Sequence, residues 1–304
     1  PVRATPKWRL EPILLDGHIN LIFGEGGIGK TTMAELFAIC IQQGWGEPLG
    51  LRSEKGSVLF ADYEQSSDDA NEILKALEAG LSLPAAADII YRRGRPPILA
   101  EMEEIQAIVQ QHDVKLMIVD SIVRACGGEK EAKENASPTI DALATLGIAV
   151  LLISHVPKDI GGPRTKTAYG SVFFWNGPRM IWEMRKEQEV GTDILDVALF
   201  NRKSNRARLH PPLGFRLDFD TLIGIKVEQR DVAKMSELGK GIPLRQQIRE
   251  LLSRGPLNAQ KIADELEAEL PSVKVKLSQG KRDGWFIDLP GQPPLWGLAT
   301  KEER

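Results

Sequence analysis

The sequence predicts an α/β protein in which a mostly parallel sheet is covered by helices and a small second domain follows. Three observations carry this prediction. Over the first 230 residues, short apolar runs alternate with helical patterns, which is typical of parallel strands connected by helices. A glycine-rich G-x-x-x-x-G-K-T segment joins the first apolar run to the first helix. From about Gly241 the pattern changes to three short helices and two strands, which predicts the second domain.

The first domain is expected to begin with four strands that alternate with four helices. The apolar runs predict strands at Ile19–Phe23, Ser57–Ala61, Lys115–Asp120 and Ala149–Ser154. Helical patterns lie at Thr31–Gln43, Asp68–Gly80, Ala100–Gln111 and Ala136–Leu146. Turns are expected at Pro84 and over 92–97. After the loop at Gly161-Gly162-Pro163, we expect further strands at Met180–Met184, Ile194–Phe200, Phe215–Phe219 and Ile223–Val227.

The second domain is expected over residues 242–304, after a linker at 231–241, so that the first domain covers 1–230. Its helices are expected at Leu244–Ser253, at Asn258–Leu266 and from near Ser272 to Lys281. Two short strands follow, at 284–287 and 295–298, joined by a Pro-Gly turn. Three helices followed by a hairpin resemble a winged-helix domain, a variant of the helix-turn-helix.

Composition places the chain among ordinary globular proteins. Of 304 residues, 42% are hydrophobic and 27% are charged, which excludes collagen-like repeats, coiled coils and wholesale disorder. No apolar run approaches the roughly 20 residues that span a bilayer, and no basic-then-apolar leader is present. Cys40 and Cys126 are expected to be buried, reduced thiols. We therefore expect a cytoplasmic protein with no membrane partner.

The segment Gly24–Thr31 reads Gly-Glu-Gly-Gly-Ile-Gly-Lys-Thr and fits the phosphate-loop motif. Glycines let backbone N–H groups approach phosphate oxygens, and the helix that begins at Lys30 directs its positive end at them. Lys30 supplies charge for the β- and γ-phosphates, and the Thr31 hydroxyl is a ligand for Mg²⁺. The sequence thus predicts a site for ATP and Mg²⁺, bound by Gly26, Gly27, Ile28, Gly29, Lys30, Thr31 and Thr32.

A second metal-binding group is expected at the end of the Lys115–Asp120 strand. Four consecutive apolar residues indicate a strand buried on both faces, which brings Asp120 to the carboxyl edge of the sheet where ligands bind. An aspartate after an apolar strand is more often a turn or helix-capping residue. Beside the phosphate loop, a role for Asp120 in holding Mg²⁺ is the better interpretation.

Hydrolysis also needs a group that orients the attacking water. The residue after Asp120 is Ser121, so this group must come from elsewhere in the chain. The strand Ser57–Ala61 is followed by Asp62 and Glu64, and both carboxylates are candidates.

The stretch from Trp8 to about Val227 resembles a RecA-fold ATPase of the hexameric DnaB/RepA replicative-helicase family. The resemblance implies that Glu64 is the catalytic carboxylate, with Asp62 as its rival. Ile153-Ser154-His155 is similar to the family's sensor motif, which implies that His155 senses the γ-phosphate.

Two further segments carry the resemblance. Arg179, nine positions after Gly170 of the Gly170-Ser171 pair, matches the stretch with the arginine finger of RepA. Such a finger enters the neighbouring subunit's site, so the resemblance implies a homo-oligomer in the form of a hexameric ring. The run from Arg202 to Arg206 is similar to the family's Lys-x-Asn element, so Lys203 and Arg206 become further trans-acting groups at the nucleotide. Relatives often carry arginine where this chain has Tyr169, which leaves Arg179 as the stronger candidate for the finger. The ordinary alternative is that the basic residues of these segments are solvated surface charges.

Contacts with nucleic acid are expected in two places. In a ring of RecA-like subunits the loop Val156–Ala168 lines the channel, where Lys158, Arg164 and Lys166 would follow the phosphates of single-stranded DNA. In the second domain, the third helix bears a set of basic residues: Lys274, Lys276, Lys281 and Arg282. A winged helix of this kind binds either duplex DNA or a replication protein, and both remain open.

Together these features predict an ATP-dependent DNA motor, a ring-forming replicative helicase of a plasmid, phage or mobile element. One alternative is a recombinase-like or KaiC-like oligomeric ATPase that does not unwind DNA. Another is a winged-helix DNA-binding regulator switched by nucleotide. The net charge of −3 is compatible with DNA binding when basic residues gather locally, at 158–166, 202–208 and 274–282.

Overall fold

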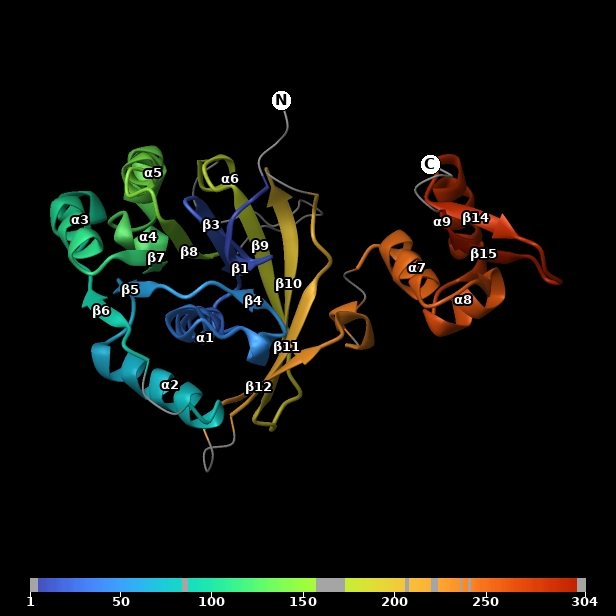
Figure 1. Ribbon diagram of the computed structural model, residues 1–304, viewed down its shortest axis with the longest axis horizontal. Coiled ribbons are helices and arrows are strands. Elements are labelled where there is room, and N and C mark those ends of the chain that lie inside the picture. Colours follow the sequence, from blue (N-terminus) through green and yellow to red (C-terminus); the bar gives the residue numbers. More distant parts are fainter. Residues whose placement is uncertain are drawn as a thin grey trace. The chain divides into compact units, whose positions relative to one another are not determined.

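A nine-stranded sheet forms the frame of the first of two units, Pro1–Val232 and Ala233–Arg304. The computed structural model describes residues 5–83, 87–156, 173–205, 208–219, 224–235, 237–239 and 242–299 (Figure 1). The strand order is β12-β11-β10-β9-β3-β8-β7-β5-β6. From β9 to β6 all neighbouring strands are parallel, and from β9 to β12 they are antiparallel. The predicted α/β class with a mostly parallel sheet is confirmed.

The parallel part of the sheet contains six strands, of which all but β6 were predicted, with bounds close to those observed. They are β3 (Ile19–Gly24), β5 (Ser57–Asp62), β6 (Ile90–Arg93), β7 (Val114–Asp120), β8 (Ala149–His155) and β9 (Met180–Glu187). The antiparallel part adds β10 (Ile194–Ser204), β11 (Leu213–Asp218) and β12 (Lys226–Arg230). Almost every residue of β3, β7 and β8 is buried, which explains their continuous apolar runs.

The register of the parallel strands brings their last residues together. Gly24 pairs with His155 across β3 and β8, and Asp62 pairs with Asp120 across β5 and β7. The residues that the sequence identified at four different strand ends therefore lie along one edge of the sheet. This carboxyl edge is where open α/β sheets bind ligands.

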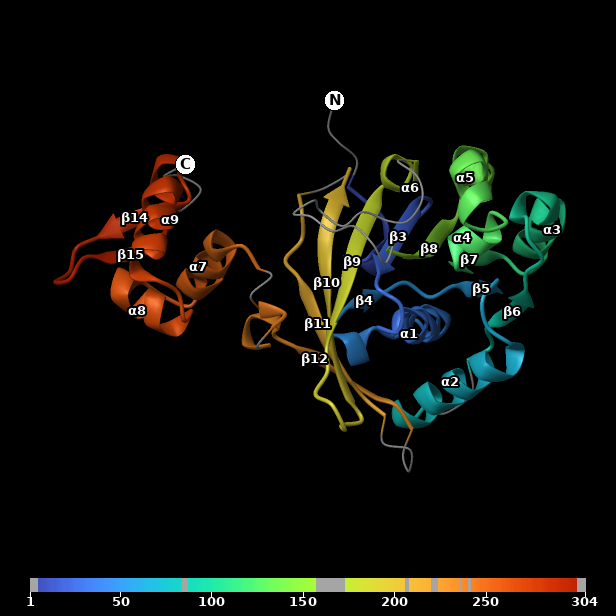
Figure 2. The same cartoon turned by 180° about the vertical axis from the view of Figure 1, so that it is seen from behind.

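Helices cover both faces of the sheet (Figures 1 and 2). On one face α1 (Lys30–Gln43) and α2 (Ser67–Gly80) pack into a core that includes Phe37 and Leu77. The other face is covered by α3 (Met102–Gln111), α4 (Ile122–Ala125), α5 (Glu129–Ala144) and α6 (Phe173–Asn176). Its core includes Ile105 and Phe174. The 3₁₀ turns η1 (Glu47–Leu49) and η2 (Ile98–Glu101) complete these connections.

Several elements differ from the sequence prediction. A small sheet of β1 (Trp8–Glu11), β2 (Leu14–Leu15) and β4 (Arg52–Ser53) was not expected. The turn predicted over 92–97 begins later, because β6 extends to Arg93 as an edge strand. The helix predicted to begin at Ala136 begins at Glu129, ahead of the internal Pro138. Cys40 and Cys126 are buried and form no disulfide.

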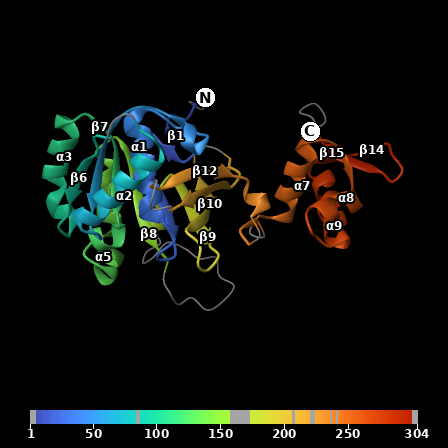
Figure 3. The ribbon, with the colours of Figure 1, turned by 90° about the horizontal axis from the view of Figure 1, so that it is seen from below.

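The second unit contains α7 (Leu244–Ser253), α8 (Ala259–Glu265), α9 (Leu270–Arg282) and a small sheet (Figure 3). The sheet has the order β13-β15-β14, with β13 at Leu257–Asn258, β14 at Phe286–Leu289 and β15 at Leu295–Leu298. Its core joins Ile248, Ile262, Leu277 and Phe286. Three helices and a hairpin occur in the predicted order, and their assignment to the winged-helix class stays a prediction.

The range expected to be a linker, 231–241, has its own local structure. The 3₁₀ turn η3 spans Val232–Lys234, and Met235 and Leu238 are buried. The division between the two units falls between Val232 and Ala233. Within the part of the chain that the structure describes, every helix is too short or too polar to cross a bilayer.

Candidate nucleotide site

The phosphate loop connects β3 directly to α1. Gly29 occupies the N-cap position of α1 with φ 82°, a left-handed conformation that favours glycine. A Cβ on Gly24 would lie 2.5 Å from the carbonyl oxygen of Met184 on β9, so this glycine allows two strands to approach closely. The residues between them, Gly26, Gly27 and Ile28, form the turn before the helix. Gly24 and Gly29 are therefore required by local backbone geometry, independently of any ligand.

Lys30 is turned back over this loop and is only 4% exposed. Its Nζ donates to the carbonyl oxygens of Gly24 and Glu25, at 3.2 and 2.6 Å, and lies 3.1 Å from Nδ1 of His155. Burial lowers the pKa of the Lys30 ammonium to about 8, although nearby carboxylates, Asp120 first, oppose this shift. The ammonium is thus placed where phosphate oxygens would bind in a loop of this kind.

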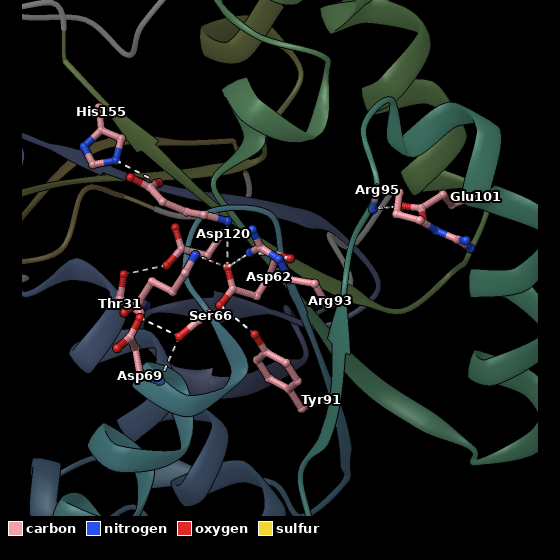
Figure 4. A network of polar contacts seen from close by, with 12 residues as sticks. Thr31, Asp62, Ser66, Asp69, Tyr91, Arg93, Arg95, Glu101, Asp120 and His155 are labelled. Carbon is pink, nitrogen blue, oxygen red and sulfur yellow. Dashed lines mark hydrogen bonds and ion pairs between the residues drawn. The ribbon is translucent and has the colours of Figure 1, made fainter.

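Thr31 and Asp120 meet at the base of the loop (Figure 4). Thr31 Oγ1 donates to Asp120 Oδ2 at 2.6 Å. Burial raises the pKa of Asp120 to about 6, the Glu64 and Asp62 carboxylates add to this rise, and the Thr31 hydrogen bond opposes it. A hydroxyl and a carboxylate oxygen so close together fit Mg²⁺, which takes few protein ligands beside phosphate and water. Within the described residues, no group of three or more His, Cys, Asp or Glu forms a metal site by itself.

Glu64 lies just beyond β5 and contacts His155 across the carboxyl edge. Glu64 Oε2 is 3.2 Å from His155 Nε2, and both side chains are about one third exposed, at 31% and 35%. The hydrogen bond from His155 lowers the pKa of Glu64 to about 2, with help from Ser121 and Arg124 and against the effect of burial. Glu64 is thus a partly exposed, ionised carboxylate.

The contacts of His155 assign its tautomer. An ammonium group can only donate, so the Nδ1 atom facing Lys30 is the acceptor. The proton of the neutral imidazole then lies on Nε2 and is donated to Glu64. Lys30, His155 and Glu64 form a continuous chain of hydrogen bonds.

Asp62, the rival of Glu64, has a different environment. It is fully buried, and its Oδ1 accepts from the backbone N–H groups of Glu64 and Gln65, at 2.7 and 2.9 Å. Its Oδ2 accepts from the Tyr91 hydroxyl at 3.0 Å, and Arg93 lies 3.3 Å from Oδ1 (Figure 4). This carboxylate holds the turn that presents Glu64. The geometry therefore favours Glu64 as the group available to water.

Two cations at this edge were not identified from the sequence. Arg124 of α4 is exposed and contributes to the lowered pKa of Glu64. Lys186 of β9 donates to the carbonyl oxygen of Gly27 in the phosphate loop at 3.2 Å. Arg124 could have been identified from the sequence, because it follows the strand-end Asp120 closely. Lys186 could be identified only once it was known that β9 pairs with β3.

Arg179 lies at the opposite, amino edge of the sheet. Its N–H donates to the carbonyl oxygen of Ile19, the first residue of β3, at 2.8 Å. Its own carbonyl oxygen accepts from Asn205 N at 3.0 Å, and its side chain is exposed. Arg179 and the phosphate loop of the same chain thus lie at the two ends of β3.

Lys203 lies at the same amino edge and is engaged with backbone. Its Nζ donates to the carbonyl oxygens of Trp175, Asn176 and Pro178, at 2.7, 2.8 and 2.9 Å. Burial and the charge of Arg179 lower the pKa of Lys203. In this arrangement Lys203 fixes the segment that leads into Arg179, and its predicted contact with nucleotide stays a prediction.

The remaining predicted residues separate into two groups. Lys158, Arg164, Lys166, Tyr169, Gly170, Ser171 and Arg206 lie outside the described residues. The others lie on α9 or at its end, where Lys274 and Arg282 are exposed, Lys276 contacts Gln279 at 3.2 Å and Lys281 pairs with Asp288 at 2.5 Å. Their role in nucleic-acid binding stays a prediction.

Comparisons with known proteins identify the family and support the fold. A family model described as an AAA domain matches residues 2–161, which include Lys30, Glu64, Asp120 and His155. The fold is similar to that of a KaiC-like protein from the archaeon Pyrococcus horikoshii OT3, with a TM-score of 0.51 and 17% identity. This match covers 74% of the present chain and 96% of the archaeal one and supports the RecA-like fold. No curated protein matches. With more than half of its length matched, the chain belongs to the AAA domain family of P-loop ATPases.

Proposed function

We propose that this chain hydrolyses ATP with Mg²⁺ at interfaces between copies of itself and acts as a DNA motor. The single observation that carries the ATPase assignment is the convergence of Lys30, Thr31, Glu64, Asp120 and His155 on one sheet edge. Each of these side chains suits a different requirement of phosphoryl transfer.

The residues divide the work as follows. Lys30 and the N–H groups of the loop bind the phosphates, while Thr31 and Asp120 would hold Mg²⁺. When bound, Mg²⁺ would neutralise negative charge that develops on the phosphate groups. Glu64 orients the attacking water and accepts its proton. His155 contacts both Lys30 and Glu64, so it links phosphate binding to the state of the base.

The position of Arg179 supports the proposal of an oligomer. Its exposed side chain begins at the amino edge, whereas the phosphate loop of its own chain lies at the carboxyl edge. An arginine finger in this position would serve the site of an adjacent copy, where it would stabilise charge on the γ-phosphate. Lys203 supports this by holding the carbonyl groups of the preceding segment.

The DNA-motor assignment rests on the resemblance to DnaB/RepA-type replicative helicases and on basic segments. Lys158, Arg164 and Lys166 would follow single-stranded DNA in the channel of a hexameric ring. The basic residues Lys274 and Arg282 on α9 would provide contacts with duplex DNA or a replication protein. In this proposal the second unit is a winged-helix domain.

A second candidate is an oligomeric ATPase of the KaiC-like kind that does not unwind DNA. The observation that favours it is the similarity in fold to the archaeal KaiC-like protein over 96% of that chain. The two candidates share the nucleotide site and differ in the response to DNA.

The test combines three measurements on the full chain. The ATPase rate is measured with and without single-stranded DNA, the mass of the assembly is measured with and without ATP, and strand displacement is followed on a forked duplex. A ring whose ATPase is stimulated by DNA and which opens the fork supports the motor. A ring or filament with DNA-independent turnover and no displacement supports the second candidate. Absence of ATPase activity in every oligomeric state contradicts both.

A further inference from the structure

Glu35 is a buried carboxyl group for which the proposed ATPase mechanism has no role. It lies on α1, four residues after Thr31, so both residues are on the same face of the helix one turn apart. The residue is 3% exposed, and neither carboxyl oxygen has a hydrogen-bond partner among the described residues. A buried acceptor without a partner destabilises the folded state, and an apolar residue of similar shape would avoid this cost.

The pKa of Glu35 is influenced by the acidic residues at the ends of β5 and β7. Burial raises the pKa of Glu35 to about 9, and the carboxylates of Asp120 and Asp62 add to this rise. Glu35 in turn contributes to the raised pKa of Tyr91, whose hydroxyl donates to Asp62. The unpartnered carboxyl is therefore within electrostatic range of Asp120 and Asp62 at the ends of β7 and β5, and it lies one helical turn after Thr31.

The other carboxylates of this cluster already have partners. Asp62 accepts from Glu64 N, Gln65 N and Tyr91 Oη, Asp120 accepts from Thr31 Oγ1, and Glu64 contacts His155. These carboxylates disfavour the ionised form of Glu35 unless a nearby cation offsets their charge. Within the described residues, Glu35 forms no hydrogen bond with Thr31 or Asp120, so its carboxyl oxygens stay available to another donor.

We propose that Glu35 is a positioning residue for the Mg²⁺ held by Thr31 and Asp120, and that its carboxyl accepts a hydrogen bond from a water ligand of that ion. This inference rests on the proposed MgATP site and adds a residue to it. Mg²⁺ keeps several waters when it binds to proteins, and these waters need acceptors. Groups that hold the ligands of a metal typically change its affinity by about 10- to 100-fold.

The inference is tested by metal affinity at constant nucleotide affinity. Mn²⁺ is titrated against the full chain with bound ADP and followed by electron paramagnetic resonance, and Mg²⁺ is measured by competition. Glu35→Leu removes the acceptor and replaces it with an apolar side chain that still fills part of the buried space. We expect this variant to lose about 10- to 100-fold in Mn²⁺ affinity and to bind ADP in EDTA as the wild type does. Glu35→Gln, whose amide oxygen still accepts, is expected to fall between the two.

Two controls make the outcome specific. Met33→Leu changes a buried residue of the same helix, within the core that includes Phe37, and should leave Mn²⁺ affinity unchanged. Thermal unfolding without metal shows that each variant folds, and Glu35→Gln remains usable where Glu35→Leu does not fold. Wild-type Mn²⁺ affinity in a folded Glu35→Leu, with a loss in Thr31→Ala, overturns the role of Glu35 and leaves the MgATP site intact. Nucleotide binding that ignores metal in the wild type overturns the MgATP site itself.

Discussion

The two edges of the parallel sheet have opposite characters. At the carboxyl edge, Lys30, His155 and Glu64 contact one another through side chains, and Thr31 contacts Asp120 in the same way. At the amino edge, Lys203 is bound to backbone carbonyl groups, and the side chain of Arg179 is exposed. The side chains at the carboxyl edge thus contact one another, as expected for a nucleotide site. At the amino edge, Lys203 is held by the backbone and Arg179 is exposed. Under the proposed function, each copy of the chain would supply the carboxyl edge of one site and offer Arg179 to the site of another copy.

Removal of Arg179 tests whether the amino edge serves a different copy. Under the proposed function, Arg179→Ala should reduce ATP turnover by about 10³-fold or more, because a finger in trans contributes that much. Nucleotide affinity and thermal stability should change little, since the side chain is exposed. The measurement is steady-state ATPase at saturating ATP.

Mixing gives the decisive version of this experiment. Arg179→Ala protein has an intact phosphate loop, and Lys30→Ala protein has an intact finger. Hybrid oligomers should therefore recover some activity when the two inactive proteins are combined. If no mixing ratio restores turnover, Arg179 does not act in the site of an adjacent copy.

The carboxyl edge itself contains a contrast between two carboxylates. Glu64→Gln should lower ATP turnover by about 10²- to 10⁴-fold while retaining ATP binding, because the group lost is the base. Asp62→Asn should instead lower the free energy of unfolding by about 1–3 kcal/mol, because Asp62 is buried and accepts from several donors. The measurements are ATPase rate, ATP affinity and chemical unfolding. Unchanged turnover in Glu64→Gln would return Asp62 to consideration as the base.

Lys30→Ala removes the ammonium group at the centre of the proposed nucleotide site. Loss of a buried charge that contacts phosphate should weaken nucleotide binding by about 100-fold or more. Binding of a fluorescent ADP measures this effect. Lys75→Ala, an exposed lysine on α2, is the matched control and should bind as the wild type does. If Lys30→Ala bound ADP with wild-type affinity, the assignment of Gly24–Thr31 as a phosphate loop would be wrong.

The lowered pKa of Lys30 predicts a smaller, pH-dependent effect. Below pH 8 the ammonium is already charged, whereas above pH 8 it must take up a proton before it can neutralise phosphate. Nucleotide affinity should therefore fall by about tenfold between pH 7 and pH 9, with proton uptake on binding at the higher pH.

Calorimetry in two buffers of different ionisation enthalpy measures both quantities. Lys30→Arg keeps its charge over this range, so the pH dependence should disappear in that variant. An affinity that stays flat to pH 9 in the wild type would show that Lys30 remains protonated when the site is free.

Sequence reasoning succeeded where a feature is local and failed where it depends on strand order. The phosphate loop, Asp120 and Glu64 each follow an apolar run, so their meeting at one edge could be inferred from a parallel sheet alone. Lys186 and Glu35 acquire their neighbours only through packing, and their immediate sequences contain no motif.

The error at 92–97 has a similar origin. Consecutive arginines beside prolines are typical of an exposed turn. In the structure Arg92 belongs to edge strand β6 and is buried against Glu101, at 2.7 Å, whose carboxylate also accepts from Tyr63. The ion pair with Glu101 therefore allows the charged Arg92 to be buried in a strand. No local sequence pattern predicts that partner.

Strand β3 has a mechanical consequence in the proposed oligomer. It is six residues long, about 20 Å at 3.3 Å per residue, and is buried throughout between β8 and β9. One end continues into the phosphate loop, and the other accepts a hydrogen bond from the backbone of Arg179. In the proposed oligomer, β3 would therefore connect the phosphate loop of one subunit directly with the arginine that the same subunit offers to the next copy.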